Sequence, residues 1–277
     1  LTGTPSFEIV HIGTFGTGPC GTFDVSSAGT ACGQGTAPNG QNQHAFFFDG
    51  DVMHNIQPLT APNGGNTWGN GLNGLGHVVG YCNPGTVSLH AYRWSVEKGT
   101  VDLGVPDWAT GNYSQAKDIN DAGTVVGFAG TVPYNLRGCV WLNGAMLEVP
   151  TLGGDESRCN AVSERGDVVG MARLESGQMR GFVLPEGDVE AMFVLDAPEG
   201  GGAWATDITE SRVACGWGTD VDGQALALRW SLAEGMVELD APDGWQTYAY
   251  DINEALWITG KAVSPDGEQF GCVWIDG

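Results

Sequence analysis

Four polar residues stand where short, otherwise similar segments of the chain depart from their common pattern: Lys117, Arg158, Asn160 and Tyr250. An arginine and a tyrosine in such places suit the binding of a carboxylate substrate. They also suit a β-elimination, in which the arginine stabilises charge and the tyrosine acts as acid or base. Arg158, Tyr250 and Lys117 are therefore candidate catalytic residues, and Asn160 is a candidate ligand contact.

Aromatic residues gather in the segments that link one similar unit to the next, and aromatic faces bind sugars and cations well. Trp68, Trp204 and Tyr248 occupy one register in these links, which favours packing between neighbouring units. Trp108 and Trp245 fall outside that register, so both ligand contact and packing are open for them. The predicted ligand contacts are Trp108, Trp245, Tyr134 and Asn160.

Other catalytic signatures are absent from the sequence. It contains no GxSxG, HExxH, GxxxxGK[ST] or CxxC motif, and its 5 histidines show no metal-ligand spacing. Asp220 and Asp222 resemble the start of a calcium loop, but the later ligand positions are not met, so a polar hairpin turn is the competing interpretation. His44 and His90 share one position of the similar units and are predicted to be structural. No cofactor is predicted.

A repeat holds these residues. The segment DINDAGTVVG from Asp118 has counterparts that start at Asp24, Gly71, Ala161, Asp207 and Asp251, at intervals of 43 to 47 residues. A period of this length indicates a solenoid, a propeller or an array. Each unit holds about four short β-rich runs with turn signals and no helical periodicity, which is typical of a propeller blade.

The ends of the chain favour a closed ring. The last unit stops where its fourth strand should begin, and residues 7–16, before the first unit, have the pattern of a fourth strand. We therefore predict an all-β, six-bladed β-propeller with four antiparallel strands per blade, in which the N-terminal strand completes the last blade and closes the ring. The predicted single domain covers 1–277, with blades at approximately 20–66, 67–113, 114–156, 157–202, 203–246, and 247–277 plus 1–19.

The repeat is similar to the HAF repeat family, whose name-giving triad stands here as His44-Ala45-Phe46 and, loosely, as His90-Ala91-Tyr92. The segments DINDAGTVVG and LEVPTLGGDES match its other signatures, while the remaining units keep the pattern and lose the triad. The resemblance covers the whole chain. It implies an exported protein, extracellular or periplasmic, and no established activity.

Charge and cysteine usage restrict the partners and the compartment. The 33 acidic and 11 basic residues give a net charge of -22, which repels nucleic acid and anionic lipid headgroups. No run of 18 apolar residues occurs, so membrane insertion is not expected. Of the 7 cysteines, Cys32 with Cys215 and Cys139 with Cys272 share registers in units that are not adjacent, too far apart for a disulfide, and the other three are scattered over different units. Most are interpreted as small buried residues. Free thiols argue against export, so a cytoplasmic location stays open.

Two faces of the predicted ring differ. The loops between second and third runs and the links between units are long and form one face, whereas the other face carries tight turns. Function usually sits on long loops. We therefore predict a non-catalytic module that binds a glycan or other small polar ligand on the long-loop face. A propeller enzyme (sugar lyase or hydrolase) at the channel mouth and a protein-interaction platform are the alternatives.

Repeated polar residues near the tight turns leave two interpretations open. They either form a carboxylate and amide surface around the channel or cap the following turn by bonding local backbone N–H groups. These residues are Asp24, Asp118, Asp207 and Asp251, with Asn73, Asn120 and Asn253.

Overall fold

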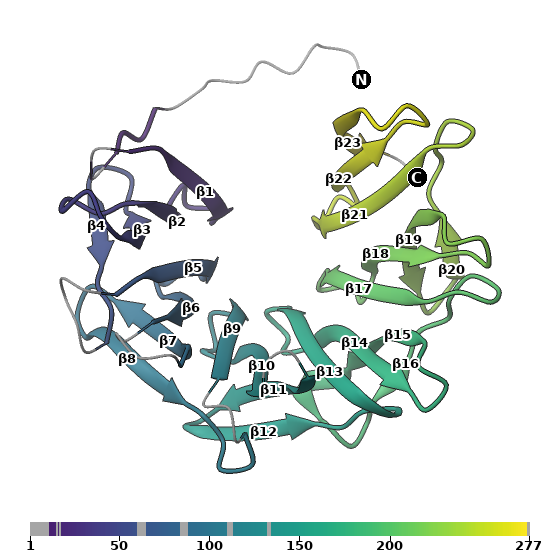
Figure 1. The fold of residues 1–277 in the computed structure, drawn as a ribbon, viewed down its shortest axis with the longest axis horizontal. Helices are drawn as coiled ribbons and strands as arrows, with labels where there is room; N and C mark the ends of the chain where they lie inside the picture. Colours follow the sequence, from purple (N-terminus) through teal and green to yellow (C-terminus); the bar gives the residue numbers. More distant parts are fainter. Residues whose placement is uncertain are drawn as a thin grey trace.

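The computed structural model describes residues 11–14, 16, 18–59, 65–83, 88–109, 113–131 and 134–275. Its strands form six antiparallel sheets arranged around a central opening (Figure 1). The predicted six-bladed β-propeller is thus confirmed. Within the described residues, the first five blades are four-stranded sheets and the sheet of blade six has three strands. No helix in this part of the chain is long and apolar enough to cross a membrane.

Within each blade the strands are hydrogen-bonded in chain order. Blade one contains β1 (Cys20–Val25), β2 (Ala31–Thr36), β3 (Gln43–Phe48) and β4 (Met53–Ile56). Blade two contains β5 (Thr67–Leu72), β6 (Val78–Cys82), β7 (His90–Ser95) and β8 (Gly99–Gly104). Blade three contains β9 (Tyr113–Ile119), β10 (Val125–Thr131), β11 (Tyr134–Leu142) and β12 (Ala145–Val149).

The second half of the ring is less regular. Blade four contains β13 (Gly153–Val162), β14 (Val168–Leu174), β15 (Met179–Leu184), the short 3-10 helix η1 (Pro185–Gly187) and β16 (Phe193–Val194). Blade five contains β17 (Ala203–Ile208), β18 (Ala214–Thr219), β19 (Ala225–Ser231) and β20 (Gly235–Glu238). Blade six contains β21 (Gln246–Ile252), β22 (Ile258–Val263) and β23 (Gln269–Trp274).

The predicted N-terminal strand, residues 7–16, falls mostly outside the described residues. Of that segment, residues 11–14 and 16 are described, and they belong to no strand. Ile12 packs against Ala31, Phe46 and Phe48, on the face of blade one that points away from blade two. The strand that would complete blade six therefore stays a prediction.

The hydrophobic core is divided among the interfaces between neighbouring blades, which we call joints. Between blades three and four, for example, Val126 and Val140 pack against Cys159, Val168 and Phe182. Successive residues of a strand point to opposite faces of the sheet, so each of blades two to five gives one apolar set to the preceding blade and another to the following blade, whereas no core cluster within the described residues joins blade six to blade one. Burying such side chains contributes roughly 25 cal/mol per Å² of apolar surface. The resulting ring holds the inner strands in place.

Close backbone contact explains the glycine that ends each VVG-like motif. A Cβ atom at Gly127 would lie 2.0 Å from the carbonyl oxygen of Gln115, and one at Gly80 would lie 1.8 Å from that of Trp68. Both distances are far too short for a carbon and an oxygen that are not bonded. A side chain at these positions would push the first and second strands apart, so the motif needs glycine.

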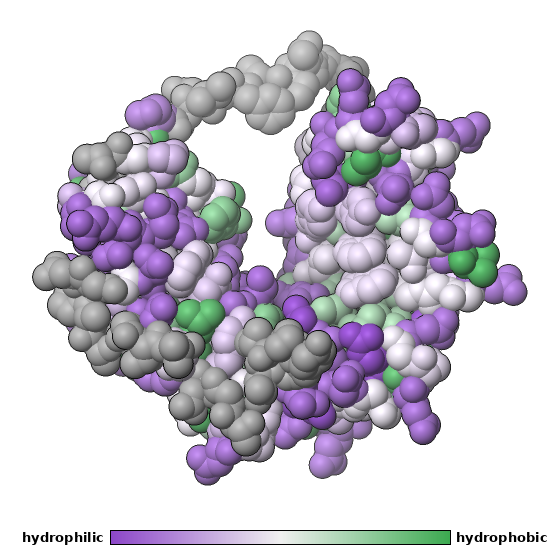
Figure 2. Space-filling view, viewed as in Figure 1, coloured by the Kyte–Doolittle hydropathy of each residue, from purple (hydrophilic) through white to green (hydrophobic). Residues whose placement is uncertain are grey.

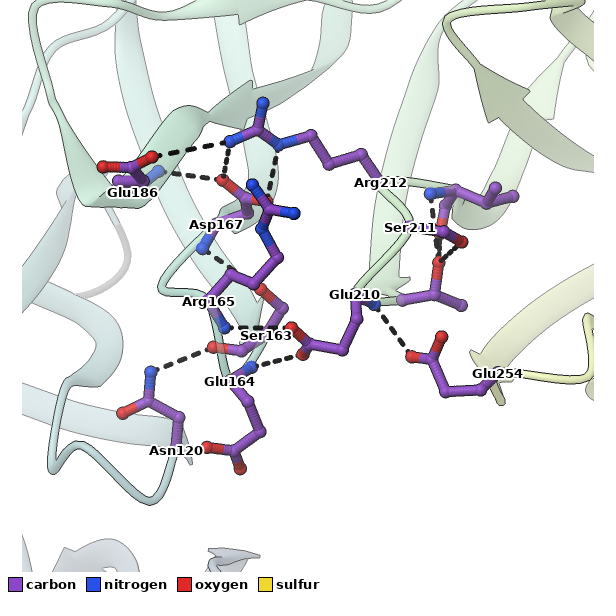
Figure 3. Close-up of polar contacts among 12 residues, drawn as sticks. Asn120, Ser163, Glu164, Arg165, Asp167, Glu186, Glu210, Ser211, Arg212 and Glu254 are labelled. Carbon is purple, nitrogen blue, oxygen red and sulfur yellow. Dashed lines mark hydrogen bonds and ion pairs between the residues drawn. The ribbon is translucent and has the colours of Figure 1, made fainter.

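The tight turns between the first and second strands are joined around the ring (Figure 3). The carboxylate of Glu210 in blade five accepts the backbone N–H groups of Glu164 at 2.6 Å and Arg165 at 3.1 Å, both in blade four. The carboxylate of Glu254 in blade six accepts the N–H of Glu210 at 2.8 Å. Acidic residues on this face therefore connect neighbouring blades, which gives part of the large negative charge a structural role.

All seven cysteines are free thiols, and all but Cys20 and Cys272 are buried, which agrees with the prediction that most of them are small buried residues. Burial raises the pKa of Cys139 to about 12 and that of Cys82 to about 11. We expect only Cys20 and Cys272 to react quickly with a thiol reagent in the folded protein, because the thiolate is the reactive form and the other thiols are shielded. Thiol counts before and after denaturation measure this. Fewer than seven reactive thiols in denaturant would contradict the free-thiol assignment.

Candidate functional site

The first strand of each blade lies next to the central opening, and each carries a β-bulge at the same position (Figure 1). A bulge inserts an unpaired residue into one strand and re-aims its side chain. The bulged residues are Phe23, Asn70, Lys117, Asn160, Thr206 and Tyr250. Three of the four polar residues singled out in the sequence are therefore equivalent positions of three blades.

Several bulged side chains bind the backbone of the next blade. Asn70 Nδ2 donates to the carbonyl oxygen of Ala116 at 2.7 Å, and Asn160 Nδ2 donates to that of Ala205 at 2.7 Å. Thr206 Oγ1 donates to the carbonyl oxygen of the matching residue in blade six at 3.1 Å. Asn160 thus joins blade four to blade five, in addition to any contact with a ligand.

The aspartates that follow the bulges also join blades. Asp118 Oδ1 accepts the N–H of Ile119 at 2.7 Å, and its Oδ2 accepts the N–H of Val162 in blade four at 2.8 Å. Asp24 and Asp207 bond to blades two and six in the same way. The interpretation of these aspartates as turn caps is wrong, because the N–H groups that they bind belong to strands.

The asparagines two residues further on do cap turns, as predicted. Asn120 Oδ1 accepts the N–H of Thr124 at 2.9 Å, and Asn253 Oδ1 accepts those of Ala255 and Trp257, each at 3.0 Å. Asn120 Nδ2 also donates to the carbonyl oxygen of Ser163 in blade four at 2.9 Å (Figure 3). The amide therefore supports its own turn and the joint to the next blade.

Burial changes the acidity of these inner carboxylates. It raises the pKa of Asp118 to about 6, because the charged form loses its water, and the two N–H bonds only partly offset this. Burial also raises the pKa of Asp24, and it raises the pKa of Asp207 well above its usual value, with the charge of Asp251 adding to the effect. In the described part of the chain these residues form no group suited to a metal ion, so we assign them to the joints.

A band of larger side chains lies nearer the long-loop face, three residues before each aspartate position. At this level, in each of blades two to six, one residue of the first strand pairs with one residue of the second strand. We call these paired residues the inner belt. The pairs are Trp68 with Tyr81, Gln115 with Phe128, Arg158 with Met171, Trp204 with Trp217, and Tyr248 with Lys261. All of these side chains except the buried Phe128 are partly exposed.

The aromatic members of the inner belt stack within blades and across them. The rings of Trp204 and Trp217 lie 4.1 Å apart with 10° between their planes, and Trp217 meets the ring of Tyr248 in blade six edge-on at 5.1 Å. Trp68 stacks on Tyr81 at 4.7 Å. Of the packing between neighbouring blades predicted for Trp68, Trp204 and Tyr248, these ring contacts show only that of Tyr248, because Trp68 and Trp204 stack within their own blades; all of these rings are partly exposed.

Two cations lie on the neighbouring inner strands of blades three and four. Arg158 binds Glu156 through Nε at 2.6 Å and Nη2 at 2.5 Å, and its guanidinium lies 5.0 Å from the centre of the Phe128 ring. Glu156 also accepts from Arg173 at 2.7 Å. Lys117 is partly buried. Burial lowers the pKa of Lys117, and the positive charge of Arg158 lowers it further.

The remaining predicted site residues do not gather at one place. Trp108 is 39% exposed between β8 and β9, whereas Trp245 packs against Phe270 with ring centres 5.3 Å apart. Tyr250 is 47% exposed on blade six, so blade five separates it from Arg158 on blade four. Tyr134 begins β11, and its side chain lies outside the described part of the structure.

The histidines and the suspected calcium loop have structural partners. His44 is buried, with Nδ1 2.9 Å from Asn55 Oδ1 and Nε2 3.2 Å from the carbonyl oxygen of Gly65, which agrees with the predicted structural role. Asp220 Oδ1 accepts the backbone N–H groups of Asp222 at 2.9 Å and Gln224 at 2.8 Å. This is the geometry of a polar turn, the interpretation that competed with a calcium loop.

Two cavities within the described residues lie away from the inner belt. The larger, of about 260 Å³, opens between blades four and five, and its mostly apolar wall includes Phe193, Leu195, Trp230 and Met236. The other, of about 130 Å³, lies in blade two beside His77. Most residues around the larger cavity belong to third and fourth strands and to tight turns, with Leu195 and Asp196 directly after β16 and Ala214 at the start of β18, and none of them belongs to the inner belt.

The second-strand residues of the inner belt are not among the site residues predicted from the sequence. These residues are Tyr81, Phe128, Met171, Trp217 and Lys261, each directly after the glycine of a VVG-like motif. A signal was present, because this position changes from unit to unit while the glycine before it does not. Variation within a regular repeat marks a place where the fold leaves the side chain free to differ.

No protein-family model matches the chain, and no curated protein matches it. Several solved structures are similar to this chain. A puromycin-hydrolyzing peptidase of Mycobacterium tuberculosis is 13% identical to it, with a TM-score of 0.61, and the match covers 93% of this chain and 43% of that chain. TolB from Acinetobacter baumannii is 10% identical with a TM-score of 0.50, over 83% of this chain and 60% of that one. This chain thus spans less than half the length of the peptidase, and at such identities the likeness shows the fold alone.

A fungal lectin of Aleuria aurantia, described as a six-bladed β-propeller with a novel mode of fucose recognition, also matches. It is 10% identical over 91% of this chain and 90% of that one, with a TM-score of 0.41. A score this low carries no argument about this chain.

Proposed function

We propose that this propeller is a non-catalytic binding module that takes a glycan or another small polar ligand at the inner belt, on the side of the long loops. The observation that carries the proposal is the stacked pair of Trp204 and Trp217 with Tyr248 beside it. All three rings are partly exposed; Trp204 and Tyr248 lie on first strands, next to the central opening that Figure 2 shows as a hollow in the ring, and Trp217 lies on β18, the second strand of blade five. Aromatic faces of this kind bind the apolar faces of sugar rings.

The catalytic alternative has less support. A sugar lyase or hydrolase that used Arg158 with Tyr250 would need both on one substrate, yet the two residues belong to blades that are not adjacent. Arg158 is also held by Glu156, which compensates its charge. Binding without catalysis needs no such pair.

The similarity to the HAF repeat family adds an extracellular or periplasmic location to the proposal. The seven free thiols fit a cytoplasmic protein equally well, so location does not enter the argument for binding.

A glycan array tests the proposal. We expect the native protein to bind a set of glycans and Trp217→Ala to weaken that binding at least about tenfold, because truncation removes one face of the stacked pair. Trp217→Tyr keeps an aromatic face and is expected to retain most of the affinity. Circular dichroism of each variant checks that the fold is kept.

Two further variants serve as controls, at the two tryptophans that were predicted from the sequence to contact the ligand. Trp108→Ala and Trp245→Ala lie outside the inner belt, so we expect both to bind as the native protein does. If either of these variants loses binding while Trp217→Ala binds as the native protein does, the ligand site lies outside the inner belt. An array on which the native protein binds nothing would overturn the proposed function and favour a protein-interaction platform.

A further inference from the structure

Lys117 differs from the bulged polar residues around it. Asn70, Asn160 and Thr206 each donate a hydrogen bond to the next blade, whereas the Lys117 side chain has no hydrogen-bond or ion-pair partner within the described residues. The ammonium group carries three donors. Partial burial of a charge without a partner costs free energy that only an anion or water can restore. The fold therefore keeps an uncompensated positive charge on an inner strand.

Arg158, on the adjacent inner strand, adds a second set of donors. Glu156 engages Nε and Nη2 of the guanidinium, and no described partner engages Nη1. Glu156 is itself shared with Arg173. Arg173 also pairs with Asp155 at 3.1 Å, so these carboxylates lie with the two arginines of blade four, and Lys117 of blade three has no ion-pair partner within the described residues.

Aromatic side chains lie beside these two cations, as in a binding site for a small polar molecule. The ring of Tyr113 lies 6.2 Å from that of Phe128, which in turn lies under the Arg158 guanidinium. Burial raises the pKa of Tyr113, so its phenol stays neutral and able to donate a hydrogen bond. Trp68 and Tyr81 stack on each other in the inner belt of blade two, the blade that precedes Lys117.

We infer that Lys117 and Arg158 bind the carboxylate of an acidic sugar, so that the ligand of the inner belt is a glycan with a uronate or a similar carboxylate-bearing residue. This inference rests on the proposed function and narrows its ligand class. A net charge of -22 repels long polyanions. One carboxylate on an otherwise neutral sugar avoids most of that repulsion and still reaches the two cations, which lie too close to the ligand for salt to screen fully.

Two monosaccharides that differ in a single group test the inference: glucuronate and glucose, each titrated into the full chain and followed by NMR or by tryptophan fluorescence. We expect glucuronate to bind the native protein more tightly than glucose does. Lys117→Met should weaken glucuronate binding at least about tenfold, the loss expected for one charge-assisted hydrogen bond, and leave glucose unaffected. Lys98→Met removes an exposed lysine of blade two and is the matched control, expected to have no effect.

A second measurement needs no ligand. Because Lys117 lacks a partner, Lys117→Met is expected to raise the midpoint of thermal unfolding, whereas Lys98→Met should leave it unchanged. A lower midpoint for Lys117→Met would mean that the lysine already has a structural partner, and this would overturn the inference. The inference is also overturned when the native protein does not respond to glucuronate, or when Lys117→Met binds it as the native protein does.

Failure of this inference and failure of the proposed function are distinguishable. Neutral glycans bound in a Trp217-dependent way, without a response to glucuronate, leave the proposed function in place and remove the acidic ligand. Glucuronate bound through Lys117, with no glycan binding that depends on Trp217, leaves the carboxylate site and removes the aromatic one.

Discussion

Replacing Arg212 with alanine is expected to lower the free energy of unfolding by about 3 kcal/mol near neutral pH, because it leaves a buried carboxylate without its cation. That carboxylate is Asp167 of blade four, which is 0% exposed. Arg212 reaches it from blade five through Nε at 2.7 Å and Nη2 at 2.9 Å (Figure 3). The backbone N–H of Glu186 is its other bond, at 2.9 Å. The pair is thus a polar joint between two blades.

The pH dependence of this loss has a defined sign. In the native protein burial raises the pKa of Asp167, but the hydrogen bonds and charge of Arg212 outweigh it, so the pKa is lowered. The pair therefore stabilises the fold above the unfolded pKa of the carboxyl group and loses this effect as pH falls through the folded pKa. Without Arg212, burial dominates and the folded pKa rises. The destabilisation should then be larger near pH 7 than near pH 4, where the carboxyl group takes up a proton.

Urea unfolding at the two pH values, followed by tryptophan fluorescence, measures both effects. Arg165→Ala is the control, because Arg165 is exposed and lies 4.0 Å from the same carboxylate. Its removal should cost less than about 1 kcal/mol. An equal loss for Arg212→Ala at both pH values would show that the buried charge is not the cause.

Replacing Ser157 with alanine is expected to cost about 2 to 3 kcal/mol of unfolding free energy. Ser157 lies in β13 of blade four, and its hydroxyl sits between two strands of blade three. Its Oγ accepts the N–H of Gly138 at 2.9 Å and donates to the carbonyl oxygen of Val149 at 2.7 Å. Both backbone groups and the hydroxyl are buried, so alanine leaves a donor and an acceptor without partners, each worth about 1 to 3 kcal/mol.

The chain itself supplies the matched control for this prediction. Thr67 makes the same bridge between blades one and two, with Ala45 N–H and the Ile56 carbonyl oxygen, each at 2.7 Å. Ser157→Thr keeps the hydroxyl and should therefore unfold close to the native protein, within about 1 kcal/mol. Equilibrium unfolding of both variants tests this. If Ser157→Ala and Ser157→Thr are equally destabilised, the cause is the shape of the site and not the hydrogen bonds.

Blade five shows why the hydroxyl matters. There Ala203 occupies the equivalent position, and the backbone N–H of Leu195 in blade four bonds directly to the carbonyl oxygen of Gly181 at 2.8 Å. The third and fourth strands of blade four therefore need no bridge. Where a hydroxyl group lies between the third and fourth strands, the pairing of these strands depends on that hydroxyl. Where the two strands bond to each other directly, it does not.

The ring, its blades and most of its turns could be predicted because they depend on short-range patterns. Alternating apolar residues specify strands, turn residues specify hairpins, and a period of 43 to 47 residues repeats the same sheet around a circle. The packing of Tyr248 against the neighbouring blade followed from its register, and the structural role of His44 followed from its place in the repeat. The recurrent glycine of the VVG-like motif could also be recognised in the sequence. The cause of its recurrence could not, because it is a carbonyl oxygen that a bulge brings close to the glycine.

What the sequence determined by itself is thus the sheet, its sixfold repetition and the register of its repeated residues, since these arise from neighbours along the chain. The partners across blades were decided only by the tertiary structure: Asp118 with the Val162 N–H, Asp167 with Arg212, and Lys117 with none among the residues that the structure describes. Each of the two bonded contacts joins residues about 45 positions apart, and its geometry depends on the angle between neighbouring sheets. That angle is set by how all the side chains of a joint pack together, which no local pattern encodes.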